Sequence, residues 1–269
     1  MTGPLTDIGA NLTHDAFDAD REAVIERARA NGVRTMIVTG ASETGSLQAL
    51  ELARSWPGTL YATAGVHPHH AKDVTPDTLS VLGECAEAPE TLAVGETGLD
   101  FFRDFSPRDV QERVFAEQLE LGAQSQLPVF MHLRDAHERF LAIVKEHRDA
   151  MLRGVVHCFT GTREELWDFL DLDLHIGITG WICDERRGHH LREFIGDIPD
   201  NRLMIETDAP YLLPRDLPGD FDPQPSGRRN EPAILPHVLA AVADATGKPD
   251  EEVAAKTTAT AREFFSIPD

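Results

Sequence analysis

The sequence has few cysteines and no long apolar run. Its 269 residues include only 3 cysteines, at positions 85, 158 and 183, and none forms a Cys-x-x-Cys pair. That spacing argues against a thiolate zinc cluster and fits a reducing compartment. No stretch approaches the ~18 consecutive apolar residues of a membrane span. The first residues lack the basic and apolar regions of a signal peptide. We therefore expect a cytoplasmic protein with no membrane partner.

Basic residues are also scarce. The chain carries 46 acidic against 25 basic residues, a formal net charge of −21. A field of this sign repels polyanions, so non-specific coating of nucleic acid is not expected. A local cleft lined by arginine or metal stays open, because screening confines surface fields to about 8–10 Å at physiological salt. Arginine far outnumbers lysine, which suits bidentate recognition of phosphate but can also reflect codon usage or a saline habitat.

Short apolar runs alternate with longer amphipathic stretches along the whole chain. The eight runs are Thr6 to Leu12, Arg34 to Thr39, Leu60 to Val66, Leu92 to Glu96, Val129 to Leu133, Val155 to Phe159, Leu174 to Thr179 and Leu203 to Thr207. Strict alternation predicts parallel strands joined by helices. Eight repeats in a chain near the usual ~250 residues predict an α/β protein, a single (β/α)8 TIM barrel that spans residues 1–269 as one domain.

Two local features refine this prediction. Ser106, Pro107 and Asp109 have the pattern of a helix start, with Ser106 as the capping residue. The segment from Pro210 to Pro232 is rich in proline and glycine and follows the last predicted strand. We expect it to be a long loop at the active site, because barrels often place such loops there.

Polar side chains recur where the predicted strands end, and that end of a parallel barrel is where its chemistry lies. They are Asp7, Asn11, His67, Glu96, His132, His157 and Asp208. Imidazole and carboxylate groups together suit a divalent cation, so we expect a metal site there. A single histidine at a strand end is more often a hydrogen-bonded structural residue, and the argument therefore depends on the set.

Glu96 and Glu206 each have a structural alternative. Glycines flank Glu96 and would let backbone approach a ligand, but this carboxylate could also cap a turn. Glu206 lies two residues before Asp208, on the same face of an extended strand, and could support the metal or simply be buried with partners. We interpret the other histidines of interest as solvated, helical or loop residues outside the site: His69, His70, His137, His189 and His190.

The motifs resemble, from Asp7 to nearly the end of the chain, the TatD family of metal-dependent deoxyribonucleases. They include Gly-Val-His-Pro at Gly65, Gly-Glu-Thr-Gly-Leu-Asp at Gly95, Met-His-Leu-Arg-Asp-Ala at Met131, His-Cys-Phe-Thr-Gly at His157, Glu-Thr-Asp-Ala-Pro-Tyr-Leu at Glu206 and Arg-Arg-Asn-Glu-Pro at Arg228. The resemblance implies that Glu96, His132, His157 and Asp208 bind the metal. It also implies an exonuclease that degrades DNA from the 3′ end and prefers single strands; RNA as a further substrate is left open at this point. DNA repair or disposal of fragments would be its cellular use.

One departure from the wider family concerns the first strand. Many members carry His-x-His there, whereas this sequence has Gly9 and Asn11. The TatD branch resembles this chain in the same respect. Loss of two nitrogen ligands shifts preference from Zn²⁺ towards the harder Mg²⁺, with Mn²⁺ next. Asp7, Asn11, His67 and Glu206 remain candidates for a second metal or for contacts that support the ligands.

For catalysis we expect Asp208 to act as general base beside the metal and Glu96 mainly to bind it, with Glu96 as the alternative base. Arg134, Arg228 and Arg229 are candidates to grip phosphate. Phe102 is the leading candidate to stack on a base, ahead of Phe101, Trp181 and Tyr211. Each of these side chains could instead serve only the surface or the closure of the barrel.

Two rival functions stay open. The same barrel and metal could hydrolyse an ester or amide, such as the aminoacyl bond of a mischarged tRNA. A scaffold or binding protein could also keep the fold, but it would be expected to lose ligands that this sequence retains. We expect a monomer, since no apolar stripe is left over after the predicted core is filled.

Overall fold

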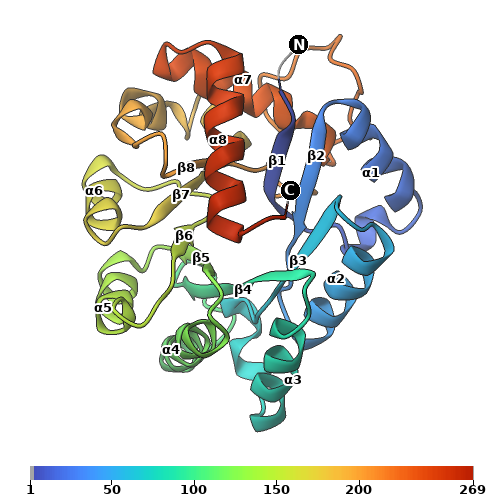
Figure 1. Ribbon diagram of the computed structural model, residues 1–269. Coiled ribbons are helices and arrows are strands. Elements are labelled where there is room, and N and C mark those ends of the chain that lie inside the picture. Colours follow the sequence, from blue (N-terminus) through green and yellow to red (C-terminus); the bar gives the residue numbers. More distant parts are fainter. Residues whose placement is uncertain (1–2, 269) are drawn as a thin grey trace. The chain divides into compact units, whose positions relative to one another are not determined.

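The computed structural model describes residues 3–268, in which strands and helices alternate along the chain (Figure 1). The strands are β1 (Leu5–Ala10), β2 (Val33–Val38), β3 (Leu60–Ala64), β4 (Thr91–Asp100), β5 (Val129–Arg134), β6 (Gly154–Val156), β7 (His175–Ile178) and β8 (Leu203–Ile205). The helices are α1 (Arg21–Ala30), α2 (Glu43–Ser55), α3 (Pro76–Ala86), α4 (Arg108–Ser125), α5 (His137–His147), α6 (Arg163–Asp171), α7 (Leu235–Thr246) and α8 (Asp250–Phe265).

The strand order confirms the predicted fold class. All eight strands belong to one sheet and follow each other in sequence order from β1 to β8. The pairs β3 with β4, β4 with β5, β5 with β6 and β7 with β8 are parallel. A parallel bridge between Ala10 and Ala209 joins the first strand to the segment just after the last. This is the topology of a (β/α)8 barrel.

The described residues form two compact units. The first unit contains residues 3–37, 158–163 and 176–263, and the second contains residues 38–157, 164–175 and 264–268. Each unit is described by itself below. The prediction of one domain over residues 1–269 stays a prediction.

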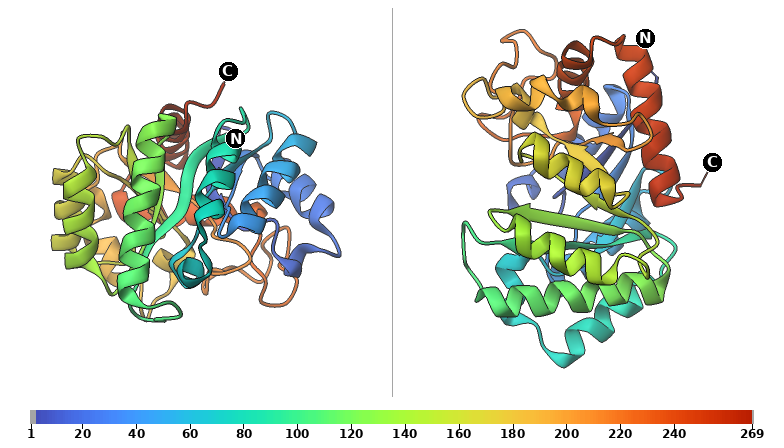
Figure 2. Two further views of the ribbon diagram at one scale, coloured as in Figure 1. Left: turned by 90° about the horizontal axis from the view of Figure 1, so that it is seen from below. Right: turned by 90° about the vertical axis from the view of Figure 1, so that its left-hand side faces the viewer.

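In the second unit, helices cover strands through aromatic packing. Phe115 of α4 stacks on Phe140 of α5, with ring centroids 5.0 Å apart, and both rings are fully buried. Figure 2 shows these two green helices side by side. Their burial fits the apolar stripes of both helices, since each large buried ring contributes roughly 2–3 kcal/mol of transfer free energy.

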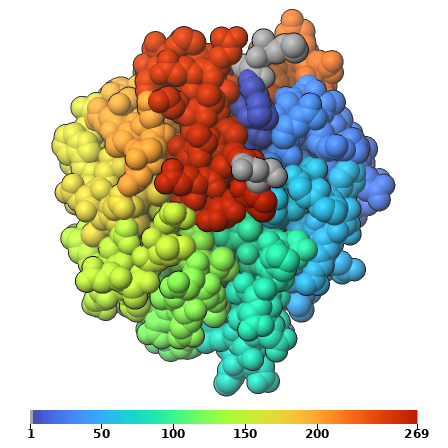
Figure 3. All heavy atoms as spheres, viewed as in Figure 1, coloured from blue at the N-terminus to red at the C-terminus, as the bar shows by residue number. Residues whose placement is uncertain are grey.

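In the first unit, helix α8 contacts the segment just before β1. The Thr258 hydroxyl of α8 donates a hydrogen bond to the carbonyl of Pro4, just before β1, at 2.9 Å. Figure 3 shows the red C-terminal residues against the dark blue start of the chain. None of the helices within residues 3–268 combines the length and the apolar character needed to cross a bilayer.

Three local predictions need correction. β4 does not end at Glu96 but continues to Asp100, because Gly98 and Leu99 keep pairing with β5. β6 ends at Val156, so His157 follows the strand. Ser106 does not cap α4, whose N-cap is Pro107; its hydroxyl instead donates to the His69 carbonyl and accepts the Lys72 amide.

Candidate metal centre

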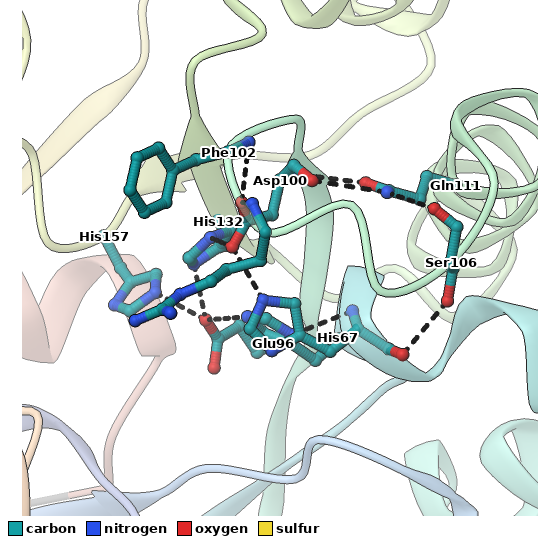
Figure 4. A network of polar contacts seen from close by, with 10 residues as sticks. His67, Glu96, Asp100, Phe102, Ser106, Gln111, His132 and His157 are labelled. Carbon is teal, nitrogen blue, oxygen red and sulfur yellow. Dashed lines mark hydrogen bonds and ion pairs between the residues drawn. The ribbon is translucent and has the colours of Figure 1, made fainter.

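Glu96 is the centre of a cluster of imidazoles in the second unit (Figure 4). Its Oε1 lies 2.7 Å from Nε2 of His157, 3.0 Å from Nδ1 of His132 and 3.4 Å from Nε2 of His67. Glu96 and His157 are buried, and the other two rings are largely buried. The structure therefore brings together three of the four predicted metal ligands, with His67 beside them. We call this group the Glu96 cluster.

The local backbone explains how β4 presents Glu96. The register between β4 and β5 slips by one residue between Val94 and Thr97, so β4 bulges where Glu96 lies. Bulges of this kind re-aim a side chain next to an active site. Gly98, at φ +142°, allows the close approach that follows, because an added Cβ there would lie 1.9 Å from the His132 carbonyl. Gly98 thus serves the close contact of β4 with β5.

A buried glutamine of α4 holds the loop that carries His67. The Gln118 side chain accepts the Val66 amide at 2.7 Å and donates to the Val66 carbonyl at 3.1 Å and to the Thr97 hydroxyl at 2.7 Å. His67 then accepts the His69 amide through Nδ1 at 3.1 Å. That bond favours the tautomer with the proton on Nε2, so His67 donates to Glu96 and is not itself a good metal ligand.

Sequence reasoning missed Asp100 and excluded His69, which extend the Glu96 cluster. Asp100 Oδ2 lies 2.7 Å from Nε2 of His69 and 3.5 Å from Nε2 of His132. Gln111 of α4 fixes the Asp100 backbone, accepting its amide at 2.9 Å and donating to its carbonyl. Alternation of Glu96, Gly98 and Asp100 would point to Asp100 only once the strand is known to continue, and its pairing with β5 decides that. His69 is a partner of Asp100 and not a solvated loop residue.

The electrostatics keep both carboxylates of this region charged. Burial opposes ionisation of Glu96, but His157, His67 and the hydrogen bonds from His132 and His157 hold its pKa well below the usual range. Burial likewise opposes charge on Asp100, and the contacts from His132 and His69 lower its pKa. For His132, burial lowers the pKa, but the contacts with Asp100 and Glu96 outweigh it and the net shift is upward.

This donor set fits a divalent cation. Two imidazole nitrogens converge on the charged Glu96 carboxylate, since Nδ1 of His132 and Nε2 of His157 lie 3.0 and 2.7 Å from its Oε1. Buried charges are normally paired or bind metals, because an isolated one is costly. A carboxylate with imidazoles suits Mg²⁺, Mn²⁺ and Zn²⁺ in different degrees.

The remaining predicted ligands lie in the first unit. Asp208 follows β8 in a left-handed conformation at φ +55° and accepts a hydrogen bond from Nδ2 of Asn11 at 3.0 Å. Glu206 is buried and accepts the Cys158 amide. These contacts orient Asp208 and give Glu206 a structural partner.

Asp7 is fully buried in the same unit and has neutral donors around it. Its carboxylate accepts the amides of Gly9 and Thr207 at 3.2 and 2.9 Å and the Thr207 hydroxyl at 2.6 Å. Burial raises the pKa of Asp7 to about 7, against these hydrogen bonds. This arrangement favours a structural role that ties β1 to the end of β8.

The predicted substrate residues differ in their availability. In the second unit, the Arg134 guanidinium lies 4.3 Å from the centre of the Phe102 ring, and Phe102 is 54% exposed. In the first unit, Arg229 donates to both oxygens of Asp20 at 2.7 and 2.8 Å, whereas Arg228 is exposed. The pairing with Asp20 favours a structural role for Arg229 over the predicted grip on phosphate.

The (β/α)8 topology and the Glu96 cluster define a metal-dependent hydrolase. The family described as TatD related DNase matches residues 6–266. The "3'-5' ssDNA/RNA exonuclease TatD" of Erwinia tasmaniensis is 51% identical over 261 residues, covering 97% of this chain and 99% of that protein. Its counterpart in Salmonella typhimurium is 49% identical over 97% of this chain and 98% of that protein.

Solved structures of TatD-type proteins have the same fold as this chain. A TatD homologue from Escherichia coli is 30% identical and superposes with a TM-score of 0.87 over 98% of each chain. A TatD family hydrolase from Entamoeba histolytica is 26% identical, with a TM-score of 0.86 over 100% of each chain. This chain belongs to the TatD-related DNase family.

Proposed function

We propose that this chain is a 3′-to-5′ exonuclease that hydrolyses single-stranded DNA and, as a second substrate, RNA. The Glu96 cluster carries the proposal, because it gathers a charged carboxylate and imidazoles where a barrel places its chemistry. Relatives about half identical over nearly the whole chain bear the same activity in their names. DNA repair, or removal of fragments, would be its use in the cytoplasm.

For the metal we propose Mg²⁺, with Mn²⁺ next and Zn²⁺ third. Glu96, His132, His157 and Asp208 would hold it. The contacts among Glu96, His132 and His157 in the second unit support the first three ligands, and the family resemblance supports Asp208. The cation would supply Lewis acidity that stabilises negative charge on a phosphoryl oxygen. His67 would orient Glu96 by its Nε2 proton, which agrees with its hydrogen bond from the His69 amide.

Asp208 is the proposed general base, accepting a proton from the attacking water, with Glu96 as the alternative. The Asn11 amide fixes one Asp208 oxygen, which leaves the carboxylate oriented for this task. Phe102 and Arg134 would form a stacking platform for a terminal base, since aromatic and guanidinium faces both stack on bases. Arg228 would contact phosphate.

The decisive experiment uses single-stranded DNA labelled separately at each end. The protein is stripped with chelator and assayed after Mg²⁺, Mn²⁺ or Zn²⁺ is restored, with Glu96→Gln as the matched variant. A ladder that shortens from the 3′ end, requires metal and is absent in the variant is expected. Folded, metal-loaded protein that cleaves aminoacyl-tRNA esters and leaves phosphodiesters intact would establish the rival ester hydrolase instead.

The same assay addresses RNA and oligomeric state. A 3′-labelled RNA of identical sequence should be shortened at a measurable rate by the wild type and not by Glu96→Gln. We propose a monomer, which light scattering at assay concentration would check; a mass of twice 29.7 kDa would contradict it.

A further inference from the structure

A second group of side chains of the types that ligate metals lies in the first unit and shares no residue with the Glu96 cluster. Cys183 ends the short 3-10 helix η3 (Gly180–Cys183), Asp216 lies in the loop after β8, and His237 is in the first turn of α7. One ligand atom from each of the three lies within 4.8 Å of the others. The proposed exonuclease activity uses none of them.

The group combines a buried thiol with an accessible carboxylate. Cys183 is 3% exposed, and the side chains of His237 and Asp216 are 16% and 49% exposed. Nε2 of His237 lies 2.7 Å from Oδ1 of Asp216. Because Asp216 faces solvent, a cation and a water molecule can reach the three ligands without opening the core.

A nucleophilic cysteine is the main alternative, and the arrangement argues against it. In a thiol nucleophile the imidazole activates the sulfur directly. Here the Asp216 carboxylate contacts both His237 and Cys183. Burial and the negative charge of Asp216 raise the pKa of the Cys183 thiol, the opposite of what a reactive cysteine needs.

We propose that Cys183, Asp216 and His237 bind one Zn²⁺, with water as the fourth ligand. Thiolate, carboxylate and neutral imidazole are three of the ligand types that zinc takes in tetrahedral sites. On binding, the thiol loses its proton to solvent, and the two negative ligands then balance the two charges of the cation. The thiolate makes this site softer than the Glu96 cluster, so it selects zinc or cobalt over magnesium.

The required adjustment is small. Ligand atoms around tetrahedral zinc lie about 3.3–3.6 Å apart, given bonds of about 2.0–2.3 Å. Asp216 and His237 must separate slightly from 2.7 Å, and the widest pair must close from at most 4.8 Å. Rotation of the exposed Asp216 side chain accomplishes much of this. The metal would clip the loop after β8 to η3 and α7.

Cobalt is the probe for this site. Chelator-treated full-length protein is titrated with Co²⁺, and thiolate-to-cobalt charge transfer in the near ultraviolet is recorded. We expect about one thiolate-bound Co²⁺ per chain, because the Glu96 cluster has no sulfur ligand and gives no such band. Added Zn²⁺ should displace this Co²⁺ and remove the band. Zn²⁺ should also raise the Tm of the wild type.

Matched variants make the assignment. Cys183→Ser should abolish the band, whereas Cys85→Ser, which removes another buried thiol, should keep it, as should Glu96→Gln. Asp216→Asn changes an exposed residue and should weaken Co²⁺ binding at least about 10-fold, since even supporting contacts change metal affinity 10–100-fold. The proposal is overturned if the wild type shows no band, if the band survives in Cys183→Ser, or if folded Asp216→Asn binds Co²⁺ as tightly as wild type.

Discussion

Glu96 of β4 and Asp7 of β1 are both buried carboxylates, yet their surroundings shift their pKa values in opposite directions. Imidazoles surround Glu96 and keep its pKa well below the usual range, although burial opposes this. Neutral donors surround Asp7, so burial prevails and its pKa rises to about 7. Burial alone therefore does not identify a metal ligand. The partners decide whether a buried carboxylate stays ionised and able to bind a cation.

The largest expected effect is on Glu96. Glu96→Gln keeps the shape of the side chain but removes its charge, so nuclease activity should fall by about 10²–10³-fold, as when a key electrostatic contact of a reacting site is lost. Single-turnover cleavage of labelled single-stranded DNA measures this, with circular dichroism as the control for folding. Activity within tenfold of wild type would contradict the contrast with Asp7.

Asp7→Asn should affect stability and spare activity. Because the folded pKa of about 7 exceeds the usual 3.8, the wild type loses stability as pH rises from about 4 to 7. That loss is a few kcal/mol at most, at 1.36 kcal/mol for each pKa unit. The amide oxygen of the variant can still accept the Gly9 and Thr207 amides, and its NH2 group can donate to the Thr207 hydroxyl oxygen in place of accepting from it. Because the side chain no longer ionises, the slope should flatten.

Urea unfolding at pH 5 and pH 8, in chelator, measures this difference. The variant should gain stability over the wild type at pH 8 and little at pH 5. Equal slopes for both proteins, or nuclease activity reduced as strongly as in Glu96→Gln, would show that Asp7 belongs with the catalytic carboxylates.

Asp100→Asn tests whether the comparison extends beyond direct ligands. Asp100 contacts His69 and His132, and loss of its charge should weaken metal affinity about 10–100-fold, the usual range for partners of ligating histidines. Half-maximal metal concentration for cleavage is the measurement. Asp104→Asn is the matched control, since the side chain of that exposed carboxylate forms an ion pair with Arg108 and, within residues 3–268, none with His69 or His132. An unchanged metal requirement in Asp100→Asn would assign Asp100 to the fold alone.

Asp20 gives the smallest expected effect. Asp20 forms ion pairs near the surface with Arg229, which has the larger effect on its pKa, and with Arg27. Together they lower the pKa of Asp20 to about 2. This contribution is present above pH 4 and disappears as pH falls towards 2. Asp20→Asn should cost about 1 kcal/mol or less at pH 7, the usual scale of exposed pairs. Thermal unfolding measures it; a large loss of nuclease activity with normal stability would show that Arg229 serves the substrate.

Most of the fold was predictable because alternation of apolar runs reports strands and helices directly. The meeting of Glu96, His132 and His157 was predictable for the same reason, since parallel strands place their ends together. The contact of Asp100 with His69 was not predictable. The apolar run predicts a strand that ends at Glu96, and the strand continues only because it pairs with β5. The hydrogen bonds of the Ser106 hydroxyl were likewise not predictable, because its partners His69 and Lys72 lie far from it in the sequence.

Helix α4 fixes the spacing between two hydrogen-bonded contacts near the Glu96 cluster. Gln111 and Gln118 lie seven residues apart, nearly two turns. Gln111 holds the backbone of Asp100, and Gln118 holds that of Val66, the residue before His67. Inserting or deleting one residue between them would rotate the Gln118 side chain by about 100° around the helix axis relative to Gln111 and break its hydrogen bonds to Val66. Chains built on this plan should therefore vary freely at Arg113, on the exposed face of α4, while keeping a fixed length between the two glutamines.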